Sequence, residues 1–448
     1  MAENATASGR TDLLDELTWR GMLHQVTDEK GLRAHLAGGV RKAYIGFDPT
    51  ADSLTVGNLV QIMMLRHCQE AGLKPIVLCG GGTGLIGDPS GKSAERELQT
   101  EERVRHNVES QKRIFGRLLD FSDRPNGAVM VNNLDWLGKI GYIEMLRDVG
   151  KFFSINQMLQ RDSVKNRLEN REQGISYTEF SYVLLQAYDY LHLHRTAGVT
   201  LQMGGSDQWG NIVSGIDLIR REAVQRAGGA GAEDVRVDAF GLTTPLITKA
   251  DGGKFGKSES GAVWLTADRT SPYAYYQFWL NASDADVGKF LRTFTLLGRE
   301  QIEDLEKQQA TSPGARPAQR GLAIAATDLL HGAAERQKAE AAAAALFSGD
   351  VRSLDAAMLG EVLAGVQTGT LARAALEAAD GVAILDLIVQ VGLVPSRGEG
   401  KTQLQAGAIS INGQKVAMEH KVTAADVLHG TMILLRKGKK NWLRVNVG

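Results

Sequence analysis

Apolar runs that alternate with helical periodicity organise the first half of the chain. Residues 41–47 (RKAYIGF) and 74–79 (KPIVLC) are short, apolar and bounded by turn residues, which predicts two buried strands. Between them, residues 54–72 form a long apolar segment that ends at Gly72, which predicts a helix. Strand, helix and strand in this order are the unit of a parallel sheet, so these first elements predict an α/β fold.

The same alternation continues to about residue 228. An amphipathic helix capped by Thr11 or Asp12 is expected before the first strand, over residues 11–25. A charged helix, a strand, a helix with a capping box at Ser176 and Glu179, another strand and a further helix are expected later, over 93–119, 127–133, 175–193, 198–205 and 207–221. This order predicts a doubly wound parallel sheet.

The rest of the chain changes character twice. Strand signals stop over about residues 260–345, which are helical, and the pattern then weakens until about residue 380. The last segment predicts two short helices and a β-hairpin turned at Asn412-Gly413. We therefore predict N-terminal helices at 1–35, an α/β domain at 36–228, a helical domain at 229–345, a linker at 346–380 and a small α+β domain at 381–448.

Charge is balanced overall but uneven along the chain. The net charge of the 448 residues is −1, so no global field indicates a nucleic-acid partner. Residues 391–448, however, hold nine Lys or Arg against three Asp or Glu. This surplus is either a solvated face or a surface for an anionic partner, and its clustering in LLRKGKKNW favours the second interpretation.

Composition narrows the cellular setting. The two cysteines, Cys68 and Cys79, lack metal-type spacing and are too few for a disulfide framework, which favours a reducing compartment. The N-terminus lacks a basic start followed by an apolar core, and no apolar run reaches the roughly 18 residues that a membrane span needs. We expect a cytoplasmic protein without a membrane partner.

The stretch PIVLCGGGTGLIGDPSGKS resembles a nucleotide loop in two ways, but neither match meets the chemistry. A phosphate loop has four residues between its first Gly and its Gly-Lys-Ser. Here Ile86 stands at the position that the first Gly would need to occupy. The G-x-G-x-x-G at Gly82 follows the second strand, and Asp88 stands where an anion would bind. Asp88 therefore either caps a structural turn or faces a cation such as a substrate ammonium.

Two further stretches carry a specific resemblance. YIGFDPTADSLTVGN at 44–58 and PLITKADGGKFGKS at 245–258, together with GLIGDP and GGSDQWGN, resemble bacterial tyrosyl-tRNA synthetase from about residue 12 to the C-terminus. The resemblance implies a class I enzyme with a Rossmann-type catalytic domain, an α-helical anticodon-arm domain that follows the lysine loop, and an S-four-like RNA-binding domain. It also implies a homodimer whose partners are L-tyrosine, ATP and tRNA(Tyr), with Mg²⁺ accompanying the ATP substrate and no permanent metal.

One helix face is expected to contribute to the tyrosine pocket. Tyr182, Gln186 and Asp189 lie at i, i+4 and i+7, which places them on one face, although this alone also suits the polar edge of an amphipathic helix. By resemblance, Asp189 and Tyr44 bind the phenolic hydroxyl. The remaining tyrosine-side positions implied by the resemblance are Tyr182, Gln186 and Asp88 for the ammonium, with Thr83 and Gln208 nearby.

Activation of a carboxylate by ATP needs positioning and cations more than a nucleophile from the enzyme. The resemblance implies catalytic roles for Thr50, Thr55, Asn58, Lys92, Arg96, Lys254 and Lys257. It implies ATP binding by Asp48, Gly57, Asp207, Lys254, Lys257 and Ser258. The positions predicted to bind tRNA are Arg220, Arg221, Arg397, Lys401, Arg436, Lys437, Lys439 and Lys440.

Thr55 departs from the family pattern, which has His-x-Gly-His where this chain has Thr-Val-Gly-Asn at 55–58. Thr55 has a shorter reach than His and cannot become cationic, so it either donates a hydroxyl to the reacting phosphates or merely caps the helix that follows. Two other functions stay open. One is an RNA-binding protein that has lost activation, and the other is a synthetase for tryptophan, in which Asp189 would be a costly unpaired carboxylate.

Overall fold

The computed structural model describes residues 12–90, 98–161, 164–165, 168, 175–228, 235–253, 255–258, 261–377, 381–438 and 441–448. The chain divides into two compact units. Unit 1 comprises Met1–Lys257, Ala262–Arg269 and Ala282–Ala325, and unit 2 comprises Ser258–Gly261, Thr270–Asn281 and Ala326–Gly448. Within the described residues, no helix is both long enough and apolar enough to cross a bilayer.

Unit 1 is built around a six-stranded sheet with the order β1-β6-β5-β2-β3-β4. Its strands are β1 (Gln25–Val26), β2 (Lys42–Phe47), β3 (Lys74–Cys79), β4 (Val129–Asn132), β5 (Leu201–Gly205) and β6 (Phe240–Thr244). All neighbours are parallel except β1, which is antiparallel to β6. Strands β3 and β4 follow β2 on one side of it, and the next strand, β5, pairs with β2 on its other side. The predicted doubly wound sheet is confirmed, and its switch point lies between β2 and β5.

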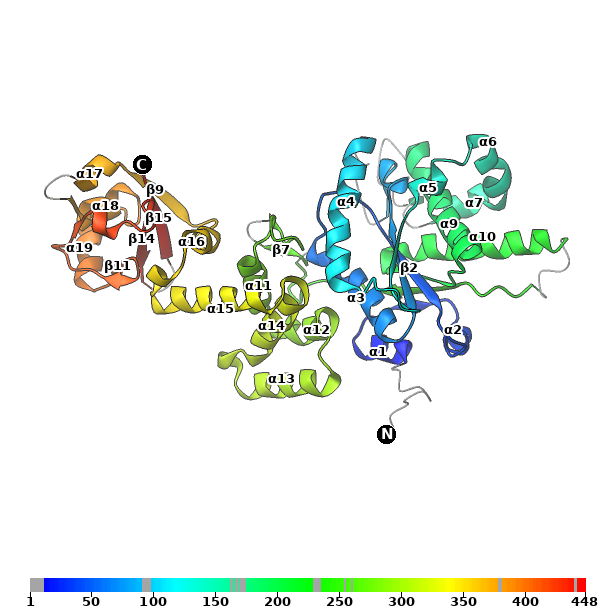
Figure 1. Ribbon diagram of the computed structural model, residues 1–448, viewed down its shortest axis with the longest axis horizontal. Coiled ribbons are helices and arrows are strands. Elements are labelled where there is room, and N and C mark those ends of the chain that lie inside the picture. The colour runs from blue at the N-terminus through cyan, green and yellow to red at the C-terminus, as the bar shows by residue number, and fades with distance from the viewer. Residues whose placement is uncertain are drawn as a thin grey trace. The chain divides into compact units, whose positions relative to one another are not determined.

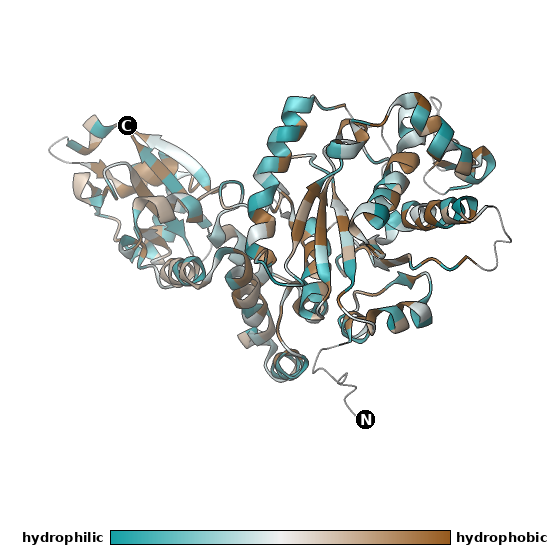
Figure 2. Cartoon of the chain, turned by 45° about the vertical axis from the view of Figure 1, so that its right-hand side comes forward, coloured by the Kyte–Doolittle hydropathy of each residue, from teal (hydrophilic) through white to brown (hydrophobic). Residues whose placement is uncertain are grey.

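Helices cover both faces of this sheet (Figure 1). Helices α3 (Val56–Glu70) and α4 (Glu101–Leu118) lie on one side, and α9 (Tyr177–Ala197) and α10 (Trp209–Arg226) lie on the other. The strands are hydrophobic along most of their length, whereas the surrounding helices mix polar and apolar residues (Figure 2). This distribution is the one expected when a parallel sheet is buried on both faces. The other helices before residue 165 are α1 (Leu13–Trp19), α2 (Glu29–Leu36), α5 (Leu134–Leu137), α6 (Tyr142–Glu144) and α7 (Ile155–Leu159).

Two predicted helices differ from the structure. Helix α1 begins at its Asp12 cap but ends at Trp19, because Gly21 adopts a φ of 69° that no helix continues through. The residues that were expected to complete this helix instead include β1. The charged helix α4 starts at Glu101 with Thr100 as its N-cap, while the predicted start at 93–97 lies outside the described residues.

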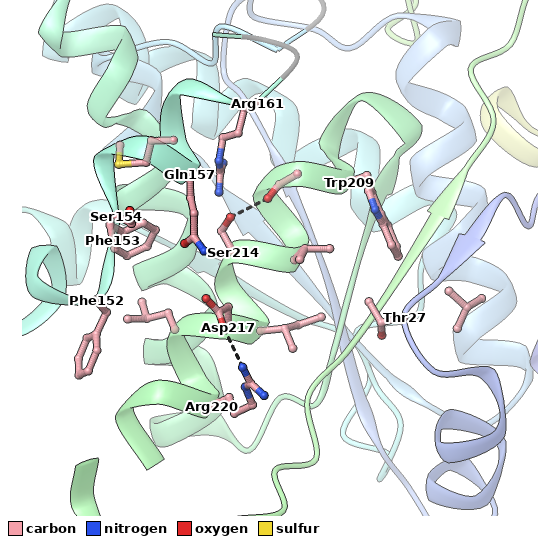
Figure 3. Close-up of a pocket in the computed structure, with 16 residues that line it drawn as sticks. Thr27, Phe152, Phe153, Ser154, Gln157, Arg161, Trp209, Ser214, Asp217 and Arg220 are labelled. Carbon is pink, nitrogen blue, oxygen red and sulfur yellow. Dashed lines mark hydrogen bonds and ion pairs between the residues drawn. The ribbon is translucent and has the colours of Figure 1, made fainter. Parts of the chain in front are cut away.

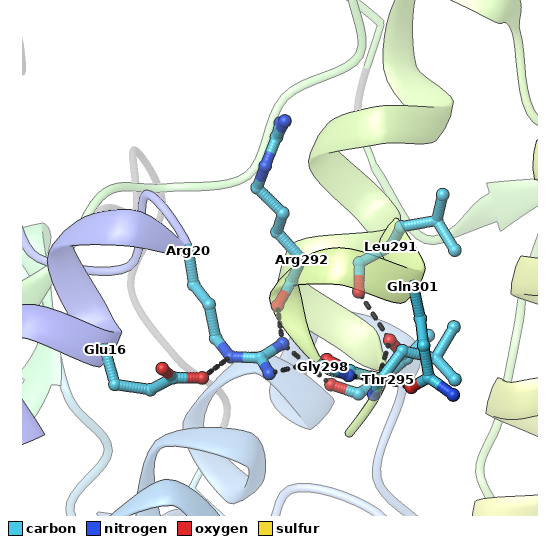
Figure 4. Close-up of polar contacts among 8 residues, drawn as sticks. Glu16, Arg20, Leu291, Arg292, Thr295, Gly298 and Gln301 are labelled. Carbon is cyan, nitrogen blue, oxygen red and sulfur yellow. Dashed lines mark hydrogen bonds and ion pairs between the residues drawn. The ribbon is translucent and has the colours of Figure 1, made fainter. Parts of the chain in front are cut away.

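The buried side chain of Arg20, which directly follows α1, contacts the backbone of residues 292–297 (Figure 4). Arg20 is 4% exposed and pairs with Glu16 at 2.6 Å. Its guanidinium also donates to the carbonyl oxygens of Arg292, Thr295 and Leu297, at 2.8, 3.0 and 2.9 Å. These carbonyls lie in the last turn of α12 (Asp284–Phe294) and just after it, where a helix leaves its last acceptors unpaired. Arg20 satisfies them and fixes α12 in unit 1. Helices α13 (Arg299–Thr311) and α14 (Pro317–His331) follow.

Unit 2 contains a second, five-stranded sheet with the order β12-β11-β14-β15-β9. Its strands are β9 (Gln367–Leu371), β11 (Ile409–Ile411), β12 (Gln414–Lys415), β14 (Met432–Lys437) and β15 (Asn441–Val447). The described helices that lie wholly in this unit are α11 (Pro272–Leu280), α15 (Ala333–Ser348), α16 (Ala356–Val362), α17 (Arg373–Glu377), α18 (Ile384–Gln390) and α19 (Arg397–Gln405). Two short strand pairs complete the described elements, β7 (Lys257–Ser258) with β8 (Gly261–Ala262) and β10 (Val382–Ala383) with β13 (Lys421–Val422).

The predicted hairpin is confirmed, since β11 and β12 are antiparallel across Asn412 and Gly413. Both residues have positive φ, 46° and 84°, as a two-residue type I′ turn requires. The segment expected to be a linker, 346–380, contains α16 and β9 instead of irregular chain alone. Strand β9 escaped the sequence pattern because its residues are mostly exposed and polar. Among the described strands it is an edge strand that pairs with β15, far along the chain.

Candidate active site

Three of the predicted tyrosine-side residues, Thr83, Asp88 and Gln208, lie beyond the carboxyl ends of strands around the switch point, and the others lie on β2 and α9. Tyr44 lies on β2, Thr83 and Asp88 follow β3, Gln208 follows β5, and Asp189 comes from α9. In open α/β sheets, ligands bind in the crevice at this edge. The fold therefore brings together side chains from four separate parts of the sequence.

Asp189 is the best-defined group of the site. It is 2% exposed, and both of its carboxylate oxygens accept a hydrogen bond. Trp136 donates its Nε1–H to Oδ1 at 2.7 Å, and Asn133 donates its Nδ2–H to Oδ2 at 2.9 Å. Burial raises the pKa of Asp189 to about 7, although the two donors act in the opposite direction. The carboxylate is thus fixed in orientation and titrates near neutral pH.

Asn133 connects Asp189 to the glycine-rich loop. Its side-chain oxygen accepts from the backbone N–H of Gly82 at 2.7 Å, and its Nδ2 also donates to the Thr83 hydroxyl at 2.9 Å. A Cβ built on Gly82 would lie 3.3 Å from that oxygen, and one built on Gly81 would lie 2.2 Å from the side-chain oxygen of Asn132. The glycines are therefore needed for close packing of asparagine side chains.

Two buried tyrosines lie close to the carboxylate. The Tyr44 hydroxyl has no hydrogen-bond partner among the described residues, although its side chain is 1% exposed. Burial, and then the charge of Asp189, raises the pKa of Tyr44 well above its usual value. The pKa of Tyr182 is raised by burial and by Asp48, Asp88 and Asp189. Because a buried hydroxyl without a partner is costly, Tyr44 is poised to bind a polar atom of a ligand.

A second polar cluster surrounds Asp88. Its Oδ2 accepts from the Gln208 side chain at 2.7 Å, and its Oδ1 accepts from the backbone N–H of Ser90 at 2.8 Å. Gln208 is also 3.2 Å from Gln186, and Asn211 donates to the Gln186 oxygen at 2.9 Å. Asp88 thus caps the turn after the glycines and also faces the cluster, so the two interpretations from sequence are compatible.

Four residues of these networks were not identified from the sequence, namely Asn133, Trp136, Asn211 and Ser90. Asn133 could have been noticed, because it directly follows β4 and parallel strands end at the same edge of the sheet. Asn211 closes the GGSDQWGN motif on the first turn of α10. Trp136 and Ser90 carry no such signal, because their contacts depend on the path of the loops.

The start of α3 shows what Thr55 does in this chain. Thr55 is the N-cap residue, and the side-chain oxygen of Asn58 accepts both its backbone N–H and its hydroxyl, each at 3.0 Å. The hydroxyl is therefore used within the cap. A Cβ built on Gly57 would lie 3.4 Å from that hydroxyl, so the glycine leaves the helix start accessible.

The remaining ATP-side residues are only partly described. Asp48 follows β2 and Asp207 follows β5, on either side of the switch point, while Thr50 lies on the turn after β2. Lys92, Arg96 and Lys254 lie outside the described residues, and only the strand backbone is described for Lys257 and Ser258. Between the lysines, Phe255 packs on Phe290 and Phe294 of α12, with ring centroids 5.0 and 5.1 Å away.

Several residues predicted to bind tRNA are engaged in contacts within the chain. Arg220 and Arg221 pair with Asp217 on α10, at 3.4 and 2.7 Å. Arg397 pairs with Asp386, and Lys437 pairs with Glu399 at 3.4 Å. Lys401 is exposed on α19, whereas Arg436 stacks over Trp442 at 4.8 Å. Lys439 and Lys440 lie outside the described residues.

A separate cavity of about 720 Å³ lies beside α10 (Figure 3). Phe152, Phe153 and Met158 line it from the segment before α9, and Asp217 and Arg220 line it from α10. Its walls include none of the residues bound to Asp189 or Asp88. Elsewhere in the described chain, no cluster of three His, Cys, Asp or Glu side chains is arranged to hold a metal ion.

Known proteins share both the fold and the motifs. Residues 38–348 match the family described as "tRNA synthetases class I (W and Y)", and residues 368–445 match a "Tyrosine--tRNA ligase SYY-like C-terminal domain". The chain is 48% identical over 429 residues to "Tyrosine--tRNA ligase 2" of Enterococcus faecalis, covering 96% of this chain and 97% of the relative. It is 47% identical over 444 residues to "Tyrosine--tRNA ligase" of Porphyromonas gingivalis, covering 97% of this chain and 100% of the relative.

A solved structure agrees with these matches. A C-terminally truncated mitochondrial tyrosyl-tRNA synthetase of Aspergillus nidulans superposes with a TM-score of 0.67 at 31% identity, covering 76% of this chain and 95% of that one. These matches show that the chain has the fold of a class I synthetase. Within that class, the chain belongs to the family of tyrosine and tryptophan synthetases, and its curated relatives above are tyrosine–tRNA ligases.

Proposed function

We propose that this chain activates L-tyrosine with ATP to give tyrosyl-adenylate and pyrophosphate, and then transfers tyrosine to the 3′ end of tRNA(Tyr). The relatives at 47–48% identity over nearly the whole chain support this reaction. The observation that carries the substrate assignment is the buried Asp189 carboxylate, held by two donors next to the unpartnered Tyr44 hydroxyl.

The pair suits a phenol. Asp189 offers acceptor capacity that Trp136 and Asn133 do not exhaust, since an ionised carboxylate has about four acceptor sites. A tyrosine hydroxyl would donate to Asp189 and accept from Tyr44, so that the buried hydroxyl would gain the partner it lacks in the described chain. Phenylalanine would leave the Tyr44 hydroxyl without a partner and would add no donor to Asp189, which makes its binding costly.

The second cluster suits the amino-acid end of the substrate. We propose that Asp88, Gln186 and Tyr182 hold the α-ammonium, with Gln208 near the carboxylate and Thr83 supporting the pocket. The hydrogen bond from Gln208 to Asp88 supports this assignment, because it links the predicted ammonium and carboxylate positions. A carboxylate that lies among neutral amide side chains attracts a cation such as an ammonium group.

At the ATP end of the site, the expected contribution of the enzyme is to position the reactants and to supply charged side chains. The substrate carboxylate attacks the α-phosphate, the bond to the β-phosphate breaks, and pyrophosphate leaves with its negative charge. We propose that Asp48, Gly57 and Asp207 bind the nucleotide, that Mg²⁺ enters as the ATP complex, and that Lys254, Lys257 and Ser258 meet the growing charge. Thr50, Asn58, Lys92 and Arg96 are proposed to assist. Cations that bind the transition state better than the substrate accelerate such a step.

The proposal is tested by charging tRNA(Tyr) with labelled tyrosine, phenylalanine and tryptophan on the full chain. Charging with tyrosine alone is expected. Charging with tryptophan in its place would contradict the pocket assignment, and tRNA binding without any charging would favour an RNA-binding protein that has lost activation.

Tyrosine affinity is expected to fall below about pH 7. Protonation of Asp189, whose pKa is about 7, removes the charged acceptor that the phenol needs. The dissociation constant for tyrosine should rise towards tenfold for each pH unit below the pKa. Equilibrium dialysis without ATP measures this free of nucleotide titration, and Asp189→Asn should lose the pH dependence. A profile that is flat down to about pH 5.5 would contradict the role of this carboxylate.

Thr55→Ala is expected to lower the melting temperature while adenylate formation stays close to the parent rate. The hydroxyl is engaged with Asn58, so its loss should cost about 0.5–2 kcal/mol, as other N-cap deletions do. Asn58→Ala is the matched control, because it removes both cap bonds, and the double variant should be less than additive. A slower pre-steady-state rate at unchanged stability would instead assign Thr55 a role in catalysis.

We further propose a cytoplasmic homodimer. Large apolar side chains are exposed on α6, α7 and α10 of the described chain, including Ile143 at 72%, Ile155 at 57% and Val213 at 39%. Val213 also lines the cavity beside α10, and exposed apolar side chains are typical of a protein–protein interface. Sedimentation equilibrium should give twice the 48.4 kDa chain mass, and Ile143→Asp should reduce it. A parent protein that stays monomeric at micromolar concentration would contradict this.

A further inference from the structure

Strand β14, at the centre of the C-terminal sheet, is buried on both of its faces over Met432–Leu435. On β14, Ile433 and Leu435 belong to the core formed with α18 and α19. Met432 and Leu434 alternate with them and point to the opposite face. All four residues are 3% exposed or less, so both faces of β14 are covered by protein.

The cover comes from the end of the helical region and from the segment predicted as a linker. Met432 and Leu434, with Leu428, form one hydrophobic cluster with residues of α15, α16 and the chain around them. The latter residues are Ala342, Ala345, Val351, Leu354, Leu359, Val362 and Leu363. We call this cluster the docking seam. The C-terminal module and α15 thus share a core within unit 2.

A contact between two glycines closes one end of the docking seam. Gly349 ends α15 with a φ of 90°, and Gly413 occupies the hairpin turn with a φ of 84°. A Cβ built on Gly413 would lie 1.5 Å from the Gly349 carbonyl oxygen, a distance at which no side chain fits. Asn412 fixes the turn by accepting from the Leu434 N–H at 2.9 Å.

Polar contacts cross the docking seam as well. The His429 Nε2 lies 2.9 Å from the Leu354 carbonyl oxygen, and Arg436 donates to the Leu346 carbonyl oxygen at 3.4 Å. Arg436 also stacks over Trp442, which packs against the same cluster. These contacts give Arg436 a docking role in addition to the tRNA contact predicted from sequence.

We propose that the docking seam holds the C-terminal module in one orientation on α15, and that this fixed orientation is required for tRNA charging but not for tyrosine activation. Ala342 and Gly413 are then positioning residues for the second step of the reaction. The proposal rests on the proposed function, since it assumes that the module binds tRNA. If the C-terminal module is held in one orientation, the acceptor end of the tRNA that it binds has a higher effective concentration at the catalytic site. A module that reorients freely would lose this advantage.

Ala342→Glu tests the docking seam from the side of the helix. Ala342 is 0% exposed and faces the cluster, whereas its neighbour Ala341 is exposed, so Ala341→Glu adds the same charge to the same helix without touching the seam. For Ala342→Glu, kcat/KM for tRNA should fall at least about tenfold, mainly through KM, while ATP–pyrophosphate exchange stays within about twofold of the parent. Ala341→Glu should match the parent in both assays.

Gly413→Ala tests the docking seam from the side of the module. Gly430→Ala is its control, because Gly430 has a comparable φ of 72° but no atom within 4 Å of its Cβ position. Gly413→Ala should lower tRNA charging and speed proteolysis within 350–366, and Gly430→Ala should do neither. Circular dichroism checks that the C-terminal module of Gly413→Ala is still folded. Its melting transition should match that of the parent.

The outcomes separate this inference from the proposed function. Unchanged kcat/KM for tRNA in both seam variants, with faster proteolysis, would overturn the required orientation while leaving the synthetase function intact. A parent chain that exchanges pyrophosphate but binds no tRNA would overturn the assumption on which the inference rests.

Discussion

Asp189→Asn is expected to reduce tyrosine activation by about 10²- to 10⁴-fold in kcat/KM. A hydrogen bond to a charged group contributes about 1.5–3 kcal/mol, and leaving a buried polar group unsatisfied costs about 1–3 kcal/mol more. The new amide would also turn a donor towards Trp136 or Asn133, both of which donate to this site in the parent. Tyrosine-dependent ATP–pyrophosphate exchange measures the loss.

Asp135→Asn is the matched control for this experiment. Asp135 is exposed on α5, one residue from Trp136, so its replacement removes one negative charge nearby and leaves the pocket intact. It should retain parental exchange. If Asp189→Asn activates tyrosine as well as the parent does, Asp189 is not the group that reads the phenol.

Truncation after Gly349 is expected to leave pyrophosphate exchange largely intact and to abolish most tRNA charging, by about 100-fold or more. The removed segment carries the local basic surplus, nine Lys or Arg against three Asp or Glu over 391–448. The C-terminally truncated Aspergillus synthetase, whose match spans 76% of this chain, supports folding of the remainder. Loss of the module should also flatten the salt dependence of tRNA binding, because fewer phosphates are neutralised.

The position of the cut follows from the structure. A cut near residue 380 would leave β9 without β15 and would expose Leu359 and Leu363 of the docking seam, which invites aggregation. Truncation after Gly349 removes most residues of that cluster at once, those of α16 as well as those of β14. Parental tRNA charging by the truncated chain would show that the C-terminal module is dispensable.

The sequence predicted the fold well where burial dictates pattern. Strands β2 and β3 are buried along most of their length, so they appear as continuous apolar runs. The charged helix α4 has one buried stripe, which its periodicity revealed.

What the sequence did not reveal depends on contacts between distant segments. Asn133 and Trp136 orient Asp189 from more than 50 positions away, and no local pattern marks such a pair. The docking seam was missed for the same reason, although the run MILLRK in β14 was a signal, since an unbroken apolar strand indicates burial on both faces. The sequence therefore indicated candidate side chains for the site but not the residues that hold them in place.

The central claim, activation of tyrosine recognised by its hydroxyl, is tested most directly by ATP–pyrophosphate exchange on the purified full-length chain. Tyrosine, phenylalanine and tryptophan are supplied separately at the same concentration, with Mg²⁺ and ATP in excess. The account predicts rapid exchange with tyrosine and little with either analogue, because only tyrosine gives Asp189 and Tyr44 a shared partner. Equal exchange with phenylalanine, preference for tryptophan, or no exchange with any of the three would contradict it.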